Sequence, residues 1–571
     1  MKKIRSYFIL VLAAAILSGC SGLNKMKKNA GLVNYDVVPE VLETHAGIVE
    51  VTIKGTFPDK YFDKNTVLEA TPVLVYEAGE TAFESVSVQG ESAQANNEVI
   101  RYTGGNFTYT STVPFQKEMS VSDLMLRLKA TRKGTSLDFD PVKLADGVIA
   151  TSTLVESQAR PIYMKDNFQR IIPEDKMADI HFLINMANIR NTELKSEDIE
   201  ALKNYLAMVS EDDRMEFKGT SVSAYASPDG ELDFNDKLAN KRAETAVKYI
   251  IQEFEKIKIE DINKENFLTS KYTAEDWEGF QTEVTNSSIE DKDLILRVLS
   301  MYSDPVVRER EIKNMAAAFE VLKEDILPKL RRSKLVINVD KVGRSDAEIL
   351  ETINSDPTVL DIEELLYAGT LTDDFNEKLK YYEIAATQVP KCIRAHNNVG
   401  YANVALGNVD EAKAAFERAQ AIQNNDVVKN NLGFVALLQG DNDKAEEFFT
   451  SMTSSTAESR FGLGTIAIMR AEYDKAVNFF GNDPSLNNAL ALVLKDDLNK
   501  AKVMLDGMEM CKCGRPSYLK AVVGARMDNK DYTMNSLREA VEFNADWKAY
   551  AATDIEFAKF AEDDAFKAII Q

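Results

Sequence analysis

The last third of the chain repeats one pattern of small and aromatic residues with a period of about 33 residues. Such a period is typical of stacked helix pairs, because each pair leaves an apolar face that only its neighbour can cover. The small residues let paired helices approach closely, and the phenylalanines fill the space between repeats. We therefore predict a helical solenoid. The recurring residues are Gly400, Gly407, Ala412, Phe416 and Ala419; then Gly433, Gly440, Ala445 and Phe449; then, slightly shortened, Gly464, Ala476 and Phe480.

The period and the order of these residues resemble the tetratricopeptide repeat. The resemblance covers residues 360–571, including weaker copies and a closing helix from about 547. It implies a groove that binds a peptide or a partner protein. Asn397, Asn403 and Asn430 fall in the first helices of clear copies, and we expect them to be exposed there. An asparagine amide can bind an extended backbone with both its donor and its acceptor, although ordinary polar surface residues are the alternative.

The first 19 residues have the composition of a secretory signal peptide. Lys2, Lys3 and Arg5 precede an apolar run that is too short to span a bilayer. The run ends in Leu-Ser-Gly-Cys20, which resembles a lipobox and implies that acyl chains anchor the chain through Cys20. The alternative is a plain signal peptide with a chance cysteine. Residues 20–35 are then expected to form a lipidated, flexible tether.

The residues after Cys20 favour a place in the outer membrane. Ser21 and Gly22 follow it, without the aspartate that often retains lipoproteins in the inner membrane. Lys25 and Lys27 replace the acidic tether of surface-exposed lipoproteins, so we expect the chain to face the periplasm. The formal net charge of −23 should repel nucleic acid and anionic membrane surfaces.

Three cysteines remain beside Cys20, so at least one thiol is unpaired unless it bridges another chain. Cys511 and Cys513 are too close in sequence for an easy bridge, and one of them would more readily reach Cys392. The sequence contains only three histidines, which disfavours a metal site. We expect no cofactor.

Residues 36–160 alternate apolar and polar residues, as strands do. One example is the run with Leu124, Leu126 and Leu128 on a single face. Gly, Asn and Pro between the runs supply turns, so a small β-sandwich is predicted. It contains no constellation of catalytic residues, so we expect it to bind a partner or to act as a spacer and not to catalyse a reaction.

Residues 172–345 change to a β-α-β-α order, with a stretch at about 256–330 that looks inserted. The order, and the run Asn235-x-x-Leu238-x-x-x-Arg242-Ala243, resemble the periplasmic OmpA-like domain. The resemblance implies binding of peptidoglycan, in which an Asp and an Arg grip diaminopimelate. Arg242 supplies the cation, but Ser227 stands where the family has its Asp.

Asp229 lies two residues beyond Ser227 and would supply the missing carboxylate only if the loop shifted. A zwitterionic ligand needs a cation for its carboxylate and an anion for its ammonium. The alternative is a fold kept for protein contacts, in which Arg242 pairs with a neighbouring acid. In the inserted stretch, Ile312, Phe319 and Leu322 fall at helical spacing and should form part of the domain's own core.

Nothing in the sequence indicates an enzyme. Gly462-Leu-Gly464 matches a dinucleotide loop only superficially, because it follows no strand, and no Walker loop or nucleophile elbow is present. The whole arrangement resembles the multidomain α+β lipoproteins of Bacteroidota that combine OmpA-like and tetratricopeptide domains. Some of those serve type IX secretion and others outer-membrane protein assembly. A periplasmic scaffold is therefore expected; the alternative is a passive tether between outer membrane and cell wall.

Overall fold

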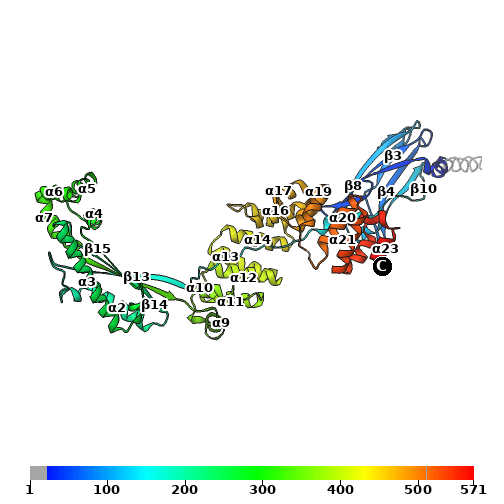
Figure 1. Cartoon of the computed structure of the whole chain (residues 1–571). Coiled ribbons are helices and arrows are strands. Elements are labelled where there is room, and N and C mark those ends of the chain that lie inside the picture. The colour runs from blue at the N-terminus through cyan, green and yellow to red at the C-terminus, as the bar shows by residue number, and fades with distance from the viewer. Residues whose placement is uncertain (1–21, 510) are drawn as a thin grey trace, which may run out of the picture. The chain divides into compact units, whose positions relative to one another are not determined.

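The computed structural model describes residues 22–509 and 511–571, and it divides the chain into two compact units. The first unit comprises the chain up to Lys165 together with Asp373–Gln571, and the second is Asp166–Thr372 (Figure 1). The second unit is thus inserted into the sequence of the first. The expected signal peptide and lipid site, Cys20, lie outside the described residues. No helix in the described ranges has the length and apolar character needed to cross a bilayer.

Residues 34–149 form two antiparallel-rich sheets, which agrees with the predicted β-rich region. The first sheet has the order β1-β3-β2-β12 with β8 paired to β3, and the second has the order β10-β9-β4-β6-β7 with β5 on β4 and β11 on β9. The strands are β1 (Asn34–Val38), β2 (Leu42–His45), β3 (Ile48–Phe57), β4 (Thr66–Tyr76), β5 (Gly79–Ala82), β6 (Val86–Gly90), β7 (Glu98–Ile100), β8 (Gly105–Pro114), β9 (Ser122–Arg132), β10 (Thr135–Asp138), β11 (Val142–Asp146) and β12 (Val148–Ile149).

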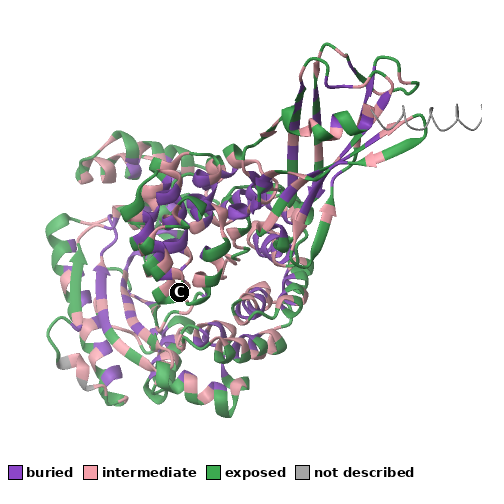
Figure 2. Cartoon of the chain, turned by 90° about the vertical axis from the view of Figure 1, so that its right-hand side faces the viewer, coloured by how far each residue is buried: buried purple, intermediate pink, exposed green. Residues whose placement is uncertain are grey.

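Alternating burial explains why the two sheets pack together. Leu124, Leu126 and Leu128 of β9 are buried, and the residues between them are not. They share one core with Val49 and Val51 of β3, so each sheet turns one apolar face inward. Figure 2 shows the same pattern as buried bands along the strands.

The flexible tether predicted for residues 20–35 is wrong for its described part. Residues 22–28 are helical, and β1 already begins at Asn34. Leu23 and Met26, three positions apart on one helical face, are buried in the core of the sandwich. The neighbouring lysines give this stretch the composition of a linker, and for that reason it was predicted to be flexible. Its two apolar side chains nevertheless attach it to the sheets.

The sandwich also ends earlier than the predicted boundary at residue 160. Its last strand stops at Ile149, and the 3-10 helix η3 (Thr151–Leu154) follows. Residues 155–165, here called the linker segment, contain no helix or strand. They belong with the helical repeats described next, where their main chain finds its hydrogen-bond partners.

The C-terminal part of the first unit consists of consecutive helix pairs, as predicted (Figure 1). After α11 (Phe375–Gln388) come α12 (Ile393–Leu406) with α13 (Val409–Ile422), α14 (Asp426–Leu438) with α15 (Asn442–Thr450), α16 (Ala457–Met469) with α17 (Tyr473–Phe480), α18 (Leu486–Leu494) with α19 (Leu498–Asp506), and α20 (Arg515–Arg526) with α21 (Lys530–Phe543). The chain closes with α22 (Asp546–Thr553), η7 (Ile555–Phe560) and α23 (Asp564–Ile570).

The recurring glycine and phenylalanine of the sequence pattern meet inside each pair. A Cβ atom on Gly433 would lie 2.6 Å from Cε1 of Phe449, and one on Gly400 would lie 2.5 Å from Cε1 of Phe416. The first helix therefore packs directly against the aromatic ring of the second. Gly440 has a different role: it adopts φ +79° just after α14, a conformation that ends helices and that other residues rarely adopt.

The sandwich and the last repeats are joined inside the first unit by buried polar contacts. Thr151 donates to the Glu556 carboxylate of η7 at 2.6 Å, and Arg526 of α20 pairs with the same carboxylate at 2.6 Å. Beside them, His45 of β2 and the Tyr473 hydroxyl lie 2.6 Å apart. The first unit thus includes both the sandwich and the solenoid.

The second unit is built on a four-stranded sheet of order β13-β16-β14-β15. Its core gathers the buried side of α2 and α3 with alternate residues of the strands, so both helices cover one face. The elements are β13 (Ile171–His181), η4 (Glu193–Lys195), α2 (Glu197–Glu211), β14 (Met215–Tyr225), α3 (Leu232–Lys256), β15 (Leu268–Thr273), α4 (Trp277–Asn286), α5 (Lys292–Met301), α6 (Pro305–Asn314), α7 (Ala316–Asp325), α8 (Leu327–Leu330), β16 (Arg332–Val342), α9 (Asp346–Ser355) and α10 (Ile362–Ala368).

The expected β-α-β-α order is present, followed by a parallel strand, β15, that the sequence did not indicate. Most of β15 is exposed, so it lacks the apolar alternation by which strands are recognised. The inserted helices α4–α8 have a small core of their own, which includes the predicted Ile312 and Leu322, with Phe319 partly buried against it. Helices α9 and α10 belong to this unit, so the repeat array starts at α11 instead of residue 360.

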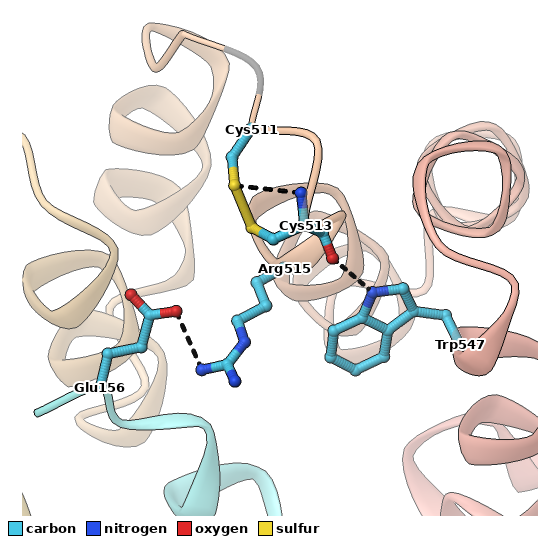
Figure 3. Close-up of a disulfide and its surroundings, with 5 residues drawn as sticks. All are labelled: Glu156, Cys511, Cys513, Arg515 and Trp547. Atoms are coloured by element: carbon cyan, nitrogen blue, oxygen red, sulfur yellow. Dashed lines mark hydrogen bonds and ion pairs between the residues drawn. A yellow bond between two sulfur atoms is a disulfide. The ribbon is translucent and has the colours of Figure 1, made fainter. Parts of the chain in front are cut away.

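The expected pairing of the cysteines was wrong, whereas the predicted unpaired thiol is present. Cys511 and Cys513 form a disulfide (Figure 3), and Cys392 is free. The turn before α20 brings the two Cα atoms to 5.2 Å, within the range that a disulfide spans. Gly514, at φ +73°, and a hydrogen bond from the Trp547 ring to the Cys513 carbonyl hold this turn.

Candidate functional site

Pairs of buried asparagines occur on the first helices of two successive repeats. Asn397 and Asn398 lie on α12, and Asn430 and Asn431 occupy the same turn of α14 one repeat later. All four side chains are fully buried. A buried primary amide must satisfy one acceptor and two donors, so each position needs a polar partner.

The partner is the linker segment. Asn398 accepts a hydrogen bond from the N–H of Met164 at 3.0 Å and donates to its carbonyl at 2.9 Å. Asn431 does the same with Ile162, at 2.6 and 2.9 Å. In extended backbone, the N–H and C=O of one residue point to the same side, and alternate residues point oppositely. Two successive repeats therefore bind residues two positions apart.

The neighbouring asparagines add further hydrogen bonds to the segment. Asn397 donates to the Ile162 carbonyl at 3.0 Å, and Asn430 donates to the Arg160 carbonyl at 3.2 Å. Asn431 also donates to Asn397 at 2.9 Å, which links the two repeats. We call the four residues, with Asn487, the asparagine clamp.

Asn487 of α18 binds the other end of the linker segment. It accepts from the N–H of Glu156 at 3.0 Å and donates to its carbonyl at 2.8 Å. The Glu156 carboxylate forms an ion pair of 2.9 Å with Arg515, next to the disulfide turn (Figure 3). The segment therefore extends along the repeats from α18 and α20 back to α12.

Side chains of the linker segment add contacts of a more selective kind. The Arg160 guanidinium lies 3.5 Å from the centroid of the Phe461 ring and binds both carboxylate oxygens of Asp483, at 2.6 and 3.2 Å. Burial alone would raise the pKa of Asp483, but hydrogen bonds from Arg160 and Ser485 outweigh it and lower the pKa. Guanidinium stacking and a bidentate carboxylate are contacts that a lysine cannot reproduce.

An aromatic residue follows three positions later. The Tyr163 ring contacts two aromatic rings, with centroid distances of 6.3 Å to Tyr382 of α11 and 5.8 Å to Tyr401 of α12. Tilted aromatic pairs at these distances are favourable beyond the area they bury. Met164 packs against the core of the first two pairs.

These contacts revise the predicted partner residues. Asn397 and Asn430 do bind an extended backbone, but they are buried, and the backbone belongs to this chain. Asn403 does not take part: it donates to the Val399 carbonyl of its own helix and accepts from Asn408. Sequence reasoning missed Asn398 and Asn431, although the recurrence of an Asn-Asn pair at the repeat period was the available signal.

In the second unit, Arg242 is buried and its donors bind main-chain carbonyls. Nε donates to Met186 at 3.0 Å, Nη1 to Tyr225 at 2.8 Å and Nη2 to Leu183 at 3.3 Å. Burial, and then the nearby charge of Arg331, lower its pKa to about 10. The alternative expectation, in which Arg242 pairs with a neighbouring acid, is therefore not what the structure contains. The predicted cation for peptidoglycan is buried, with its donors on main-chain carbonyls.

The other predicted ligand residues lie close to one another around the loop before α3. Ser227 donates to Asp229 at 2.5 Å, and Asn235 donates to the carbonyls of Ser227 and Gly230, both at 3.1 Å. The sequence did not single out Arg331, which lies 3.4 Å from the Asp229 carboxylate. The Asp229 carboxylate is therefore already paired, with the Ser227 hydroxyl and with Arg331. The cavity beside it, lined by Asp229 and Trp277, has a volume of only about 10 Å³.

Within the described residues, no group of three or more His, Cys, Asp or Glu side chains is arranged to hold a metal ion.

Comparison with known proteins agrees with the helix pairs. Residues 393–426, which include α12 and α13, match the tetratricopeptide repeat family, so this helix pair is one such repeat. Similar solved structures include a tetratricopeptide repeat protein from Parabacteroides merdae, with 14% identity over 40% of this chain and 91% of that chain and a TM-score of 0.30. Another is YrrB, described as a TPR protein with an unusual peptide-binding site, with 17% identity over 36% and 98% and a TM-score of 0.22. A third is the Cut9–Hcn1 complex, with 14% identity over 60% and 74% and a TM-score of 0.33. No curated protein matches the sequence.

Proposed function

We propose that this chain is a non-enzymatic scaffold that holds partner proteins through its tetratricopeptide repeats, at the periplasmic side of an outer membrane. The asparagine clamp supports this proposal most directly. It binds an extended backbone through main-chain groups that every residue except proline offers in full. A surface that binds the main chain accepts segments of many sequences.

The membrane location is proposed from the sequence. A basic start, a short apolar run and Cys20 in a lipobox-like context support lipid anchoring. Fractionation of cells tests it: replacement of Cys20 by alanine should move the protein from the membrane fraction to the soluble fraction. Cys392→Ala is the matched control and should stay in the membrane. Equal distribution of the two variants would contradict the anchor.

The scaffold role is proposed to serve envelope assembly, in type IX secretion or in the assembly of outer-membrane proteins. Crosslinking in intact cells, followed by mass spectrometry, tests this role and requires no assumption about which protein the partner is. We expect one envelope protein to be recovered in roughly stoichiometric amount, as a specific interface would give. Recovery of the chain alone, or of a broad background in proportion to abundance, would contradict it.

A further inference from the structure

We propose that the first-helix surface of the repeats is a binding site for extended peptides that carry an arginine and, three residues later, an aromatic residue. This inference rests on the proposed scaffold function and specifies its ligand. The linker segment, residues 155–165, acts as the chain's own occupant of this site and displays what the site selects. A partner segment of the same class competes with it.

The backbone contacts define the conformation that the ligand must adopt. Glu156, Ile162 and Met164 each present N–H and C=O together to one asparagine. All three are even-numbered, as expected for a segment in which alternate residues face the repeats. Pro161 is odd-numbered, so its missing N–H falls on the side that the clamp does not use. In a helical ligand, the main-chain N–H and C=O groups are already hydrogen-bonded to each other. Such a ligand would leave the buried asparagine side chains without partners.

The side-chain contacts define the sequence of the ligand. Arg160 has a stacking partner, Phe461, and a carboxylate partner, Asp483, which together fit a guanidinium. Tyr163 has two aromatic partners, Tyr382 and Tyr401, which suit a planar ring. Ser157 and Gln158, by contrast, are exposed, and the site does not constrain the ligand at those positions.

The site binds its ligand unevenly along its length. Gly462 of α16 occupies the turn at which α12 and α14 carry Asn398 and Asn431, and a side chain there would collide with Phe449, 2.4 Å from its Cβ position. One repeat therefore lacks a clamp, and the Arg160 side chain provides the contact beside it. Loss of Arg160 should consequently weaken the segment more than loss of an exposed residue.

The intact chain holds its own segment with an advantage over any free peptide. A segment in the same chain has an effective concentration in the millimolar range and does not lose the freedom that a separate molecule loses on binding. A free peptide with the same contacts should therefore bind the unmodified chain weakly. Weakening the segment without altering the repeats should open the site.

The test uses the full mature chain and a fluorescent synthetic peptide that carries residues 154–166. The double variant Arg160→Ala, Tyr163→Ala leaves every repeat residue in place, and we expect it to bind the peptide at least 10-fold more tightly than the unmodified chain. Adding Asn431→Ala should reverse this gain, whereas adding the exposed Asn424→Ala should not. A peptide with alanine in place of both the arginine and the tyrosine should bind at least 10-fold more weakly.

Equal affinity of the unmodified chain and the double variant would overturn the proposal. So would equal affinity of the two peptides. A second measurement needs no substitution in the protein: excess peptide should accelerate amide hydrogen exchange at Ile162 and Met164 of the unmodified chain. Unchanged exchange at saturating peptide would likewise overturn it.

The outcome is separable from that of the scaffold proposal. If crosslinking recovers a stoichiometric partner but no peptide enters the site, the scaffold function stands and the partner uses another surface. If peptides bind as expected but no cellular partner is recovered, the peptide site stands and the scaffold function fails.

Discussion

The side-chain amide of Asn431 forms two hydrogen bonds with Ile162, a residue far away in sequence, and both are with the main chain. The tetratricopeptide repeats thus bind an extended segment, and the segment is part of the same polypeptide. This relationship connects the linker segment to the repeats and shows how the repeats bind a backbone.

Replacing Asn431 by alanine should lower the free energy of unfolding of the first unit by about 1–3 kcal/mol, because the buried N–H of Ile162 loses its acceptor. The Ile162 carbonyl loses one donor but keeps the hydrogen bond from Asn397. Denaturant unfolding measures the change. Asn424→Ala, at an exposed position, is the control and should stay within about 0.5 kcal/mol of the unmodified chain. A similar loss in both variants would mean that the clamp adds nothing specific.

Gly433→Ala should destabilise the repeats by about 1–3 kcal/mol, because the added methyl group would lie 2.6 Å from the Phe449 ring. The companion change Phe449→Leu removes part of the ring and should make the alanine less harmful in the double variant than in Gly433→Ala alone. Thermal unfolding of the unmodified chain, the two single variants and the double variant gives the coupling energy between the two residues. Additive losses would contradict direct packing of this pair.

Asp554 should make the stability of the first unit fall as pH rises. Burial is the main cause that raises its pKa from 3.8 to about 6, against a hydrogen bond from Tyr518 that lowers it. Between these values the folded chain holds more protons than the unfolded chain, so the contribution present below pH 4 is lost by pH 6–7. It amounts to about 3 kcal/mol at 1.36 kcal/mol per pKa unit.

The side chain of the Asp554→Asn variant cannot ionise, so the pH-dependent contribution of Asp554 to stability should be absent. The unfolding free energy of the variant minus that of the unmodified chain should therefore rise by up to about 3 kcal/mol from pH 4 to pH 7.5. Because a difference is measured, the titration of other carboxylates cancels. A difference that does not change with pH would show that the carboxyl titrates normally.

Arg242→Ala should destabilise the second unit by at least about 2 kcal/mol, because the carbonyls of Leu183, Met186 and Tyr225 lose their donors. The same variant tests the alternative function, a passive tether to the cell wall. Sedimentation with isolated sacculi that is lost in Arg242→Ala, while circular dichroism shows the fold retained, would support wall binding. We expect the loss of stability whether or not sacculi bind.

Features with a sequence period were predictable. The repeat pattern predicted the helix pairs, and alternation predicted the buried leucines of β9, because in both cases one residue type recurs on one face. The inserted helices were predictable for the same reason. Local periodicity carries information about which face is buried. The contact of Phe449 with Gly433 inside one pair was not predicted, since the phenylalanines were expected between repeats.

Features without a period were not predictable. The linker segment has no regular element, and the asparagines that bind it lie 234–331 residues away, so nothing local marks it. Leu23 and Met26 lie among lysines and were assigned to a flexible tether, although two apolar residues suffice to fix a short helix on a sheet. The Cys511–Cys513 bridge depends on a turn at Gly514 that spacing alone does not indicate.

Amide hydrogen exchange of the unmodified full chain, resolved at single residues, tests the binding of the linker segment most directly. The amides of Ile162 and Met164 should exchange at least about 100-fold more slowly than that of the exposed Gln158, since each must break a buried hydrogen bond before it exchanges. Exchange of all three amides at the rate of an unstructured peptide would contradict the account, because the asparagines would then hold no backbone at all.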